Sequence, residues 1–248
     1  MSVLNIAAYR FVPLDDLPAL KARLLADAAS QGLKGTVLLA AEGINLFLAG
    51  SAEGIHGFII QLTADPRFAG LHFKRSFSDA QPFQKLLVKI KPEIITLRQP
   101  QVNPALKPAP SVAPEQLRQW LDQGHDDDGR PLVLLDTRNA FEVAHGTFDG
   151  AVHPDIEKFS DYPEHLAKLG DLSGKTIVTF CTGGIRCEKA APWMLQAGYE
   201  HVVQLEGGIL NYFEHCGSAH YHGGCFVFDE RRALDGDLQV LRGAQTPM

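Results

Sequence analysis

Cysteines are the residues of this 248-residue chain whose type and placement most suggest chemistry. The four of them all lie in the last third of the sequence: Cys181, Cys187, Cys216 and Cys225. A disulfide framework is typical of a small secreted chain with cysteines throughout, and the start MSVLNIAAYRFVP does not resemble a secretory signal. The clustering therefore points to reactive thiols or to metal binding.

Cys181 opens the segment CTGGIRC, directly after the apolar run TIVTF. A loop of small residues that leads into a helix turns several unpaired backbone amides inward, and the helix start adds partial positive charge. Two glycines permit the curled backbone, and an arginine supplies a fixed cation. The loop residues after the cysteine are Thr182, Gly183, Gly184, Ile185 and Arg186. We expect this loop to lower the pKa of Cys181 below the free value of ~8.5, which makes it a nucleophilic thiolate.

The length of this loop limits the chemistry. Four residues separate Cys181 from Arg186, whereas cysteine phosphatases use five between the same residue types to fit a tetrahedral phosphate. The shorter ring favours a smaller ligand such as sulfur and disfavours phosphatase activity. The competing interpretation is that Cys181 is a small apolar residue at the end of a strand, as cysteine often is.

Other polar residues near this segment are candidates for supporting roles. Cys187 could resolve an oxidised or persulfidated Cys181, or it could face into the packing of the following helix. Asp136 is expected to brace the loop at its strand end rather than to act as an acid or base, and Arg138 and Arg186 are expected at the mouth of the active site. The segment HCGSAHYHGGC holds four residues able to bind zinc, but a glycine-rich return loop explains it as well, and we predict no metal site.

The elements that must position Cys181 alternate between helix and strand. Helices are predicted at 113–124, from about 187 to 198 and at 209–215, and strands at 131–138, 174–181 and 201–205. Strands separated by helices form a mostly parallel sheet, in which ligands bind beyond the carboxyl ends of the strands. Cys181 falls at one of those ends. The charge run HDDDGR at 125–130 is expected to be a solvated turn.

The first hundred residues follow a different order. A strand, a helix at 16–32, two strands joined at Glu42-Gly43, a helix at 51–68 and a last strand within 82–97 give β-α-β-β-α-β, which predicts a ferredoxin-like sandwich. The first helix is expected to bury one face, formed by Leu17, Leu20, Leu24 and Leu25. In the last strand, apolar residues alternate with Lys85, Lys89 and Lys91, which indicates one buried and one basic face.

A proline-rich stretch separates these two parts. Its prolines favour an extended, semi-rigid linker. We predict a ferredoxin-like domain at 1–98, a linker at 99–114, a catalytic domain at 115–218 and a C-terminal extension at 219–248. Residues 1–100 hold 11 basic and 8 acidic residues and the rest hold 12 and 21, so the charges are +3 and −9. Lys85, Lys89 and Lys91 are therefore our candidates for RNA phosphate contacts, with a solvated sheet surface as the alternative.

Residues 110–215 resemble a rhodanese domain, on the segments LLDTRNAFEVAHGTFDGAVH, CTGGIRCEKA and LEGGILNY. Together with GTVLLAAEGIN, PFQKLLVKIKPEIITL and CFVFDERR, the chain resembles the bacterial tRNA uridine-34 hydroxylase family over nearly its whole length. The resemblance implies an α/β protein in which an acylphosphatase-like, ferredoxin-like domain precedes a rhodanese-like domain with a mostly parallel sheet.

The resemblance also implies an oxidoreductase that uses O2 to convert the wobble uridine of the tRNA anticodon loop to 5-hydroxyuridine. It implies that Cys181 is essential, described by analogy as a persulfide carrier, while the electron donor stays unidentified. Our hypothesis is that Cys181 adds to C6 of the uracil ring and activates C5. The alternatives are a sulfurtransferase that works through a cysteine persulfide and a non-catalytic interaction module. Because no window approaches the ~18 apolar residues of a membrane span, we expect a cytoplasmic protein.

Overall fold

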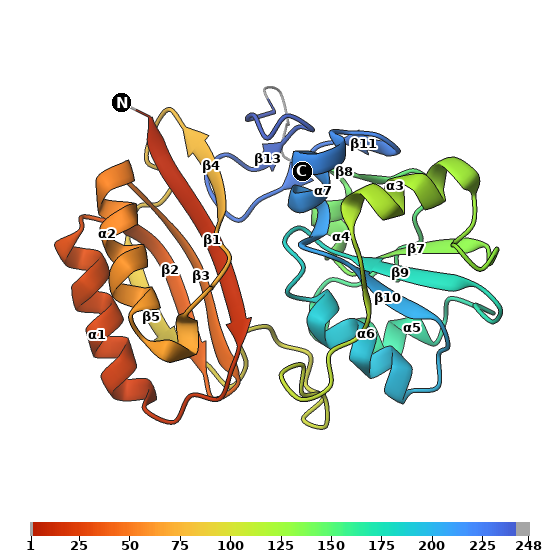
Figure 1. The fold of residues 1–248 in the computed structure, drawn as a ribbon, viewed down its shortest axis with the longest axis horizontal. Helices are drawn as coiled ribbons and strands as arrows, with labels where there is room; N and C mark the ends of the chain where they lie inside the picture. The colour runs from red at the N-terminus through yellow and green to blue at the C-terminus, as the bar shows by residue number, and fades with distance from the viewer. Residues whose placement is uncertain (1, 242–248) are drawn as a thin grey trace. The chain divides into compact units, whose positions relative to one another are not determined.

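The computed structural model describes residues 2–241, which divide into two compact units (Figure 1). The first unit comprises the chain up to Thr96 and also a later segment, Asp229–Arg231. The second comprises Leu97–Phe228 and the described residues from Arg232 onward. Residues 242–248 of the predicted C-terminal extension lie outside the described residues. No helix within residues 2–241 is long and apolar enough to cross a membrane.

The first unit is a five-stranded sheet with two helices, α1 (Leu17–Ser30) and α2 (Ala52–Thr63), on one face (Figure 1). The strand order is β4-β1-β3-β2-β5. The strands are β1 (Val3–Phe11), β2 (Lys34–Ala40), β3 (Gly43–Gly50), β4 (Lys74–Ser78) and β5 (Leu86–Ile90). The first four pair antiparallel in the order of a ferredoxin-like sandwich, which confirms the predicted class.

Our prediction of the closing strand was wrong. The strand that completes the β-α-β-β-α-β order is β4, which pairs with β1, whereas β5 is an additional strand that runs parallel to β2. The segment KRSFS of β4 is short and mostly polar, and as an edge strand it needs only one partner. The longer alternation of lysine and apolar residues in 85–91 gave the stronger strand pattern, although Val88 is the buried residue within β5 and Ile90 is 41% exposed.

Helix α1 buries a narrower face than predicted. Its buried residues are Leu20, Leu24 and Ala28, which are spaced four apart and so lie along one stripe. Leu25 is 41% exposed because one further residue turns the side chain by about 100° around the helix axis. Helix α2 begins as predicted at Ser51, whose side chain accepts a hydrogen bond of 3.0 Å from the Gly54 amide.

The second unit is built on a parallel sheet of four strands in the order β6-β10-β9-β7, which confirms the prediction. Helices α3 and α7 pack together on one face, and α5 and α6 lie on the other (Figure 1). The strands are β6 (Ser111–Val112), β7 (Leu132–Asp136), β9 (Thr176–Phe180) and β10 (Val202–Leu205). The helices are α3 (Pro114–Gln123), α4 (Ala140–Val143), α5 (Tyr162–Leu166), α6 (Cys187–Gln196) and α7 (Gly208–Cys216).

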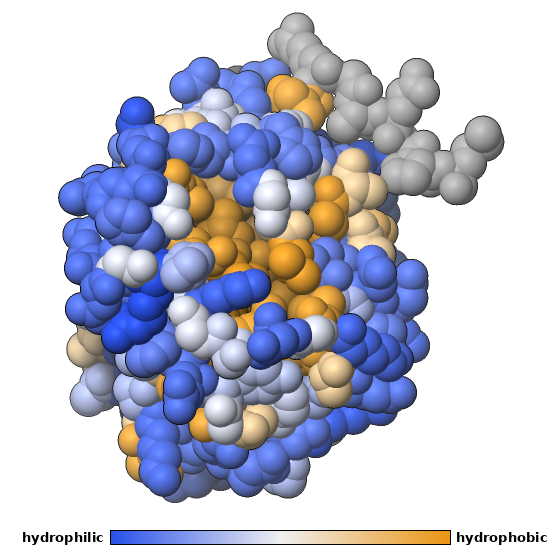
Figure 2. All heavy atoms as spheres, turned by 90° about the vertical axis from the view of Figure 1, so that its right-hand side faces the viewer, coloured by the Kyte–Doolittle hydropathy of each residue, from blue (hydrophilic) through white to orange (hydrophobic). Residues whose placement is uncertain are grey.

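Two short antiparallel pairs flank this sheet: β8 (Gly146–Phe148) with β11 (Tyr221–Gly223), and β12 (Cys225–Phe226) with β13 (Ala233–Leu234). The first pair closes an aromatic core. Within it the Phe148 ring meets the rings of Phe180, Tyr212 and Tyr221 edge to face, with 4.8–5.2 Å between ring centres. Figure 2 shows one outer face of the unit, where hydrophobic residues gather at the centre within a hydrophilic surround. Every residue of β9 is buried, so the strand that ends at Cys181 is held on both faces.

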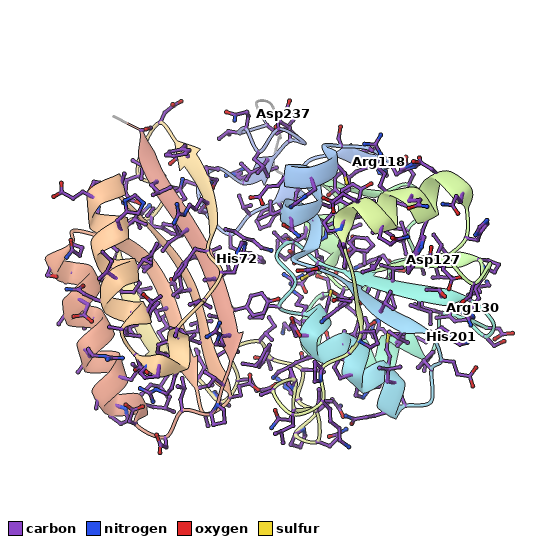
Figure 3. All side chains as sticks on the ribbon, in the orientation of Figure 1. His72, Arg118, Asp127, Arg130, His201 and Asp237 are labelled. Atoms are coloured by element: carbon purple, nitrogen blue, oxygen red, sulfur yellow. The ribbon has the colours of Figure 1, made fainter. Side chains whose placement is uncertain are left out.

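The predicted solvated turn at 125–130 contains a buried carboxylate. Asp126 is only 5% exposed and accepts hydrogen bonds from the Arg130 amide at 2.8 Å and from the Thr176 hydroxyl. The turn therefore ties the start of β7 to the start of β9, and it is solvated only at its outer residues. Figure 3 shows Asp127, Arg130 and His201 at this amino-terminal end of the strands, and Cys181 follows the opposite, carboxyl end of β9.

Candidate active site

Cys181 directly follows the last residue of β9, and the loop that it opens ends where α6 begins at Cys187. This is the carboxyl edge of a parallel sheet, where such folds bind their ligands. Cys181 is 1% exposed, while Thr182 and Gly183 next to it are half-buried. The loop thus lies at the expected edge, with its sulfur covered and its first two following residues partly open to solvent.

The groups around the Cys181 sulfur are mostly hydrogen-bond donors. The Gly184 amide donates to Sγ at 3.1 Å, and the Arg186 amide and the Cys187 thiol also donate to it. Burial by itself raises the pKa of this thiol. The Cys187 hydrogen bond, the Arg186 charge and the two backbone amides outweigh burial and lower the pKa from 9.0 to about 6. The thiolate is therefore the main form of Cys181 at neutral pH.

The start of α7 fixes the backbone of the loop. The amides of Ile209 and Leu210 donate to the carbonyl oxygens of Cys181 and Thr182, at 2.9 and 3.1 Å. Gly208 has φ +68°, and a Cβ at this position would lie 2.4 Å from the Cys181 carbonyl oxygen. Only glycine permits this close approach. The Gly-Gly turn thus lets the first amides of α7 approach the loop and hold it in its curled form.

Arg186 is held beside the thiol by a buried carboxylate. Its Nη2 lies 2.9 Å from Oε1 of Glu142, which is fully buried, and Oε2 of Glu142 accepts the Asn139 amide at 3.1 Å. We expected Arg186 at the mouth of the site, but the residue is buried, with 6% of its surface exposed. The Glu142 carboxylate therefore holds the positive charge of Arg186 in place, and this charge lowers the pKa of Cys181.

Asp136 and Arg138 form a second buried ion pair, at the end of β7. The Asp136 carboxylate accepts from Arg138 Nη2 at 2.6 Å and from the Thr147 hydroxyl at 2.8 Å, and Arg138 Nη2 also donates to the Gly146 carbonyl oxygen at 2.7 Å. Both side chains have no exposed surface. We expected Arg138 at the mouth of the site, but the structure places it in the interior, where it braces β7 against β8.

Cys187 lies in direct contact with Cys181. It has no exposed surface, its sulfur is 3.7 Å from the Thr137 hydroxyl, and its thiol donates to the Cys181 sulfur. Burial and then the hydrogen bond and charge of Cys181 raise the pKa of Cys187 well above 9.0. Cys187 is therefore packed into the start of α6 and also adjacent to the candidate nucleophile. Its position is compatible with both roles considered from the sequence, a resolving thiol and a residue of the helix packing.

An aromatic cluster beside the loop was not predicted. Its members are Phe141, Phe226 and Phe228, whose rings meet edge to face at 5.2–6.3 Å. The Thr182 hydroxyl donates to the Phe226 carbonyl oxygen at 3.3 Å, and the Arg186 guanidinium lies 5.7 Å from the Phe228 ring centre. Phe141 and Phe228 are 43% and 49% exposed. The alternating phenylalanines of CFVFDERR indicate one aromatic face, but they do not indicate that this face packs against Phe141 beside the loop.

Among the remaining candidates, Cys225 hydrogen-bonds Thr182 of the loop, whereas the two histidines pair with carboxylates. His220 bonds Asp122 at 2.7 Å and His222 bonds Asp149 at 2.9 Å, and residues 2–241 hold no group of three or more His, Cys, Asp and Glu side chains placed to bind a metal ion. Burial raises the pKa of Cys225 to about 12 and also raises that of Cys216.

Lys85, Lys89 and Lys91 belong to the first unit and are exposed. Lys89 of β5 pairs in register with Leu38 of β2. Leu38 pairs on its other side with Asn45 of β3, and Asn45 pairs with Tyr9 of β1. These four side chains therefore share one face of the sheet. On the neighbouring row, Phe47 of β3 points to the same face. This face carries a basic edge and aromatic residues on its central strands.

Comparison with known proteins identifies both units. The UPF0176 acylphosphatase-like domain matches residues 3–94 and the rhodanese-like domain matches residues 113–215. The tRNA uridine(34) hydroxylases of Cupriavidus taiwanensis and Ralstonia nicotianae are 57% and 58% identical over 240 and 239 residues, which is 96% of this chain and 85% of each relative. Among solved structures, a rhodanese-like domain from Anabaena is 23% identical over 46% of this chain and 79% of its own, with a TM-score of 0.38. The chain belongs to the tRNA uridine(34) hydroxylase family.

Proposed function

We propose that this protein hydroxylates C5 of uridine 34 in tRNA, with dioxygen as co-substrate and the Cys181 thiolate as the catalytic nucleophile. The observation that carries the proposal is the ring of hydrogen-bond donors around the Cys181 sulfur, which lowers the pKa of this thiol to about 6. A thiolate can add to C6 of uracil, which places negative charge at C5 and prepares that carbon to react with an oxygen species. Elimination of the thiolate afterwards restores the 5,6 double bond.

The supporting residues have separate roles in this proposal. Gly183 and Gly184 let the loop curl around the sulfur, Arg186 holds the positive charge that stabilises the thiolate, and Thr182 and Ile185 complete the ring. Asp136 and Arg138 brace the strand end next to the loop. The target base has to leave the anticodon stack to reach Cys181, which a single-stranded loop permits at low cost.

The tRNA contacts that we propose come from both units. The exposed rings of Phe141 and Phe228 lie beside the loop and offer faces on which a nucleobase next to the target can stack. Lys85, Lys89 and Lys91 supply positive charge for backbone phosphates. Because the substrate is tRNA, we propose that the protein works in the cytoplasm.

Mass spectrometry of tRNA nucleosides tests the proposed reaction. We expect cells that lack this protein to lose 5-hydroxyuridine derivatives at the wobble position, and wild-type protein to restore them. Cys181→Ala should not restore them, whereas Cys216→Ser, which changes a cysteine on α7, should. Unchanged wobble nucleosides in the deletion strain would contradict the proposal. Stable adduct formation with tRNA that carries 5-fluorouridine tests the addition to C6.

A sulfurtransferase is the second candidate, and the loop size favours it. Four residues separate Cys181 from Arg186, one fewer than in cysteine phosphatases, and the donors around the sulfur would also stabilise a persulfide anion on Cys181. Rapid transfer of sulfur from thiosulfate to cyanide by the purified protein, together with normal tRNA in the deletion strain, would favour this candidate. An inert interaction module would instead predict that Cys181→Ser complements the deletion.

A further inference from the structure

The two thiols at the ends of the loop differ in character, and Thr137 lies next to both. Its hydroxyl donates to the carbonyl oxygen of Phe180, the residue before Cys181, at 2.9 Å and lies 3.7 Å from the Cys187 sulfur. Cys181 ends the strand side of the loop and Cys187 begins α6, six residues later, yet the Cys187 thiol donates directly to the Cys181 sulfur. A thiolate beside a thiol that already points at it is the arrangement from which a disulfide forms with the least rearrangement.

Hydroxylation by dioxygen requires a donor of two electrons, and a pair of thiols can donate two electrons. One oxygen atom enters the base and the other leaves as water, so each turnover consumes two electrons. A dithiol that becomes a disulfide releases two electrons and two protons. If the protein is the hydroxylase proposed above, one of its groups or a bound donor must therefore be oxidised in each turnover.

We propose that the Cys181–Cys187 dithiol is the immediate electron donor of the reaction, with Cys187 as a second catalytic residue. Dioxygen at C5 and elimination of Cys181 from C6 leave a 5-hydroperoxide beside the thiolate. The thiolate attacks the distal oxygen, the O–O bond breaks, and the products are 5-hydroxyuridine and a sulfenate on Cys181. The Cys187 sulfur then attacks the sulfenate sulfur, the S–O bond breaks, and the Cys187 proton leaves with the oxygen as hydroxide.

The sum of these steps balances. One uridine, one dioxygen, one thiolate and one thiol give one 5-hydroxyuridine, one disulfide and one hydroxide ion. The oxidant is dioxygen, and an external thiol or phosphine reductant has to reduce the disulfide before the next turnover.

The surroundings of the pair suit the two roles. Arg186 and the amides of Gly184 and Arg186 stabilise negative charge on the Cys181 side, so the thiolate and the sulfenate both form there. Cys187 keeps its proton because it is buried and faces that charge, and it can therefore deliver the proton to the departing oxygen. Gly183 and Gly184 lie between the two cysteines, so the backbone between them can adjust as the sulfurs close to a bond length of about 2.05 Å.

A single-turnover experiment tests the proposal. The full chain is reduced, freed of reductant without oxygen, mixed with excess unmodified tRNA and then exposed to dioxygen. Nucleoside mass spectrometry measures 5-hydroxyuridine, and mass spectrometry of the protein after alkylation measures the Cys181–Cys187 disulfide. We expect about one 5-hydroxyuridine and one disulfide per chain, and further product only after a phosphine reductant is added. Product with both thiols intact would overturn the proposal but not the proposed function. No product here from a protein that restores wobble 5-hydroxyuridine in cells would likewise overturn only the proposal, whereas unchanged wobble nucleosides in the deletion strain would contradict the proposed function itself.

A variant separates redox chemistry from packing. Cys187→Ser should still make up to one equivalent of product but leave a sulfenic acid on Cys181, which a cyclic 1,3-diketone traps and mass spectrometry detects. Cys187→Ala provides the same readout without a hydroxyl group, and Cys216→Ser should behave like the wild type. If both Cys187 variants form product without trapped sulfenic acid, or if wild-type protein forms product without the disulfide, the proposal is wrong.

Discussion

At the scale of single residues, the state of Cys181 depends on a few neighbours rather than on exposure. Burial opposes ionisation, and the Cys187 thiol, the Arg186 charge and two amides reverse its effect. Cysteine, glycine and arginine at these spacings predicted the loop and its direction of pKa shift. Glu142 could not be predicted as the partner that holds Arg186, because 44 residues separate the two along the chain and only the fold brings them together.

The pH dependence of Cys181 follows from this environment. Its pKa of about 6 lies below that of a free thiol, so the thiolate is present at pH 7 and is lost as the pH falls through 6. We therefore expect the rate of Cys181 alkylation, and single-turnover hydroxylation, to fall on the acid side with a midpoint near pH 6. Arg186→Gln removes the nearby charge and should move the midpoint upward. An alkylation midpoint near 8.5 in the wild type would contradict this prediction.

At the scale of elements, the loop is held from outside by the first turn of α7. Gly208→Ala should displace the loop, because its φ of +68° disfavours a side chain and its Cβ would lie 2.4 Å from the Cys181 carbonyl oxygen. We expect a loss of stability of more than about 1 kcal/mol in urea unfolding and a raised midpoint for Cys181 alkylation. Gly217→Ala also places a side chain at a positive φ, +59°, but its Cβ meets nothing within 4 Å, so it controls for the backbone strain without the contact with the loop. Unchanged alkylation in Gly208→Ala would contradict the prediction.

The aromatic cluster gives a second prediction at this scale. Stacking of a base on an aromatic side chain contributes about 1–3 kcal/mol, so Phe228→Ala and Phe141→Ala should each raise the KM for tRNA at least about fivefold. The rate constant of a single turnover at saturating tRNA should change less, because neither ring touches the Cys181 sulfur in the proposed reaction. Leu195→Ala, at an apolar residue of α6 that is 39% exposed, serves as the control. Equal KM values for all three variants would contradict the stacking role.

The elements also explain what the sequence could and could not predict. The buried parallel strands, the helix start at Ser51 and the Gly-Gly turn have strong local signals, and the structure contains each of them. The closing strand of the first unit was assigned wrongly because β4 is short and polar and its position depends on pairing with β1. Phe141 and Phe228 were missed because their contact depends on the return of the chain at β12, which local periodicity does not encode.

At the scale of the whole molecule, charge separates the two parts of the sequence, with +3 in residues 1–100 and −9 in the remainder. If Lys85, Lys89 and Lys91 contact phosphates, replacing all three with glutamine should weaken tRNA binding and reduce the slope of log K against log salt by about 2. The matched control replaces Lys107, Lys158 and Lys168, which are exposed residues of the second unit. Equal salt slopes for the two triple variants would contradict the phosphate contacts.

The tripeptide Asp229–Arg231 belongs to the first unit although the chain on both sides of it belongs to the second. Arg231 donates to the Ser76 hydroxyl at 2.6 Å, and Gln84 donates to the Glu230 carboxylate at 3.3 Å. The polypeptide therefore crosses from one unit to the other three times. A single protease cut within residues 99–110 should leave two fragments that elute as one particle under native conditions and separate only in denaturant.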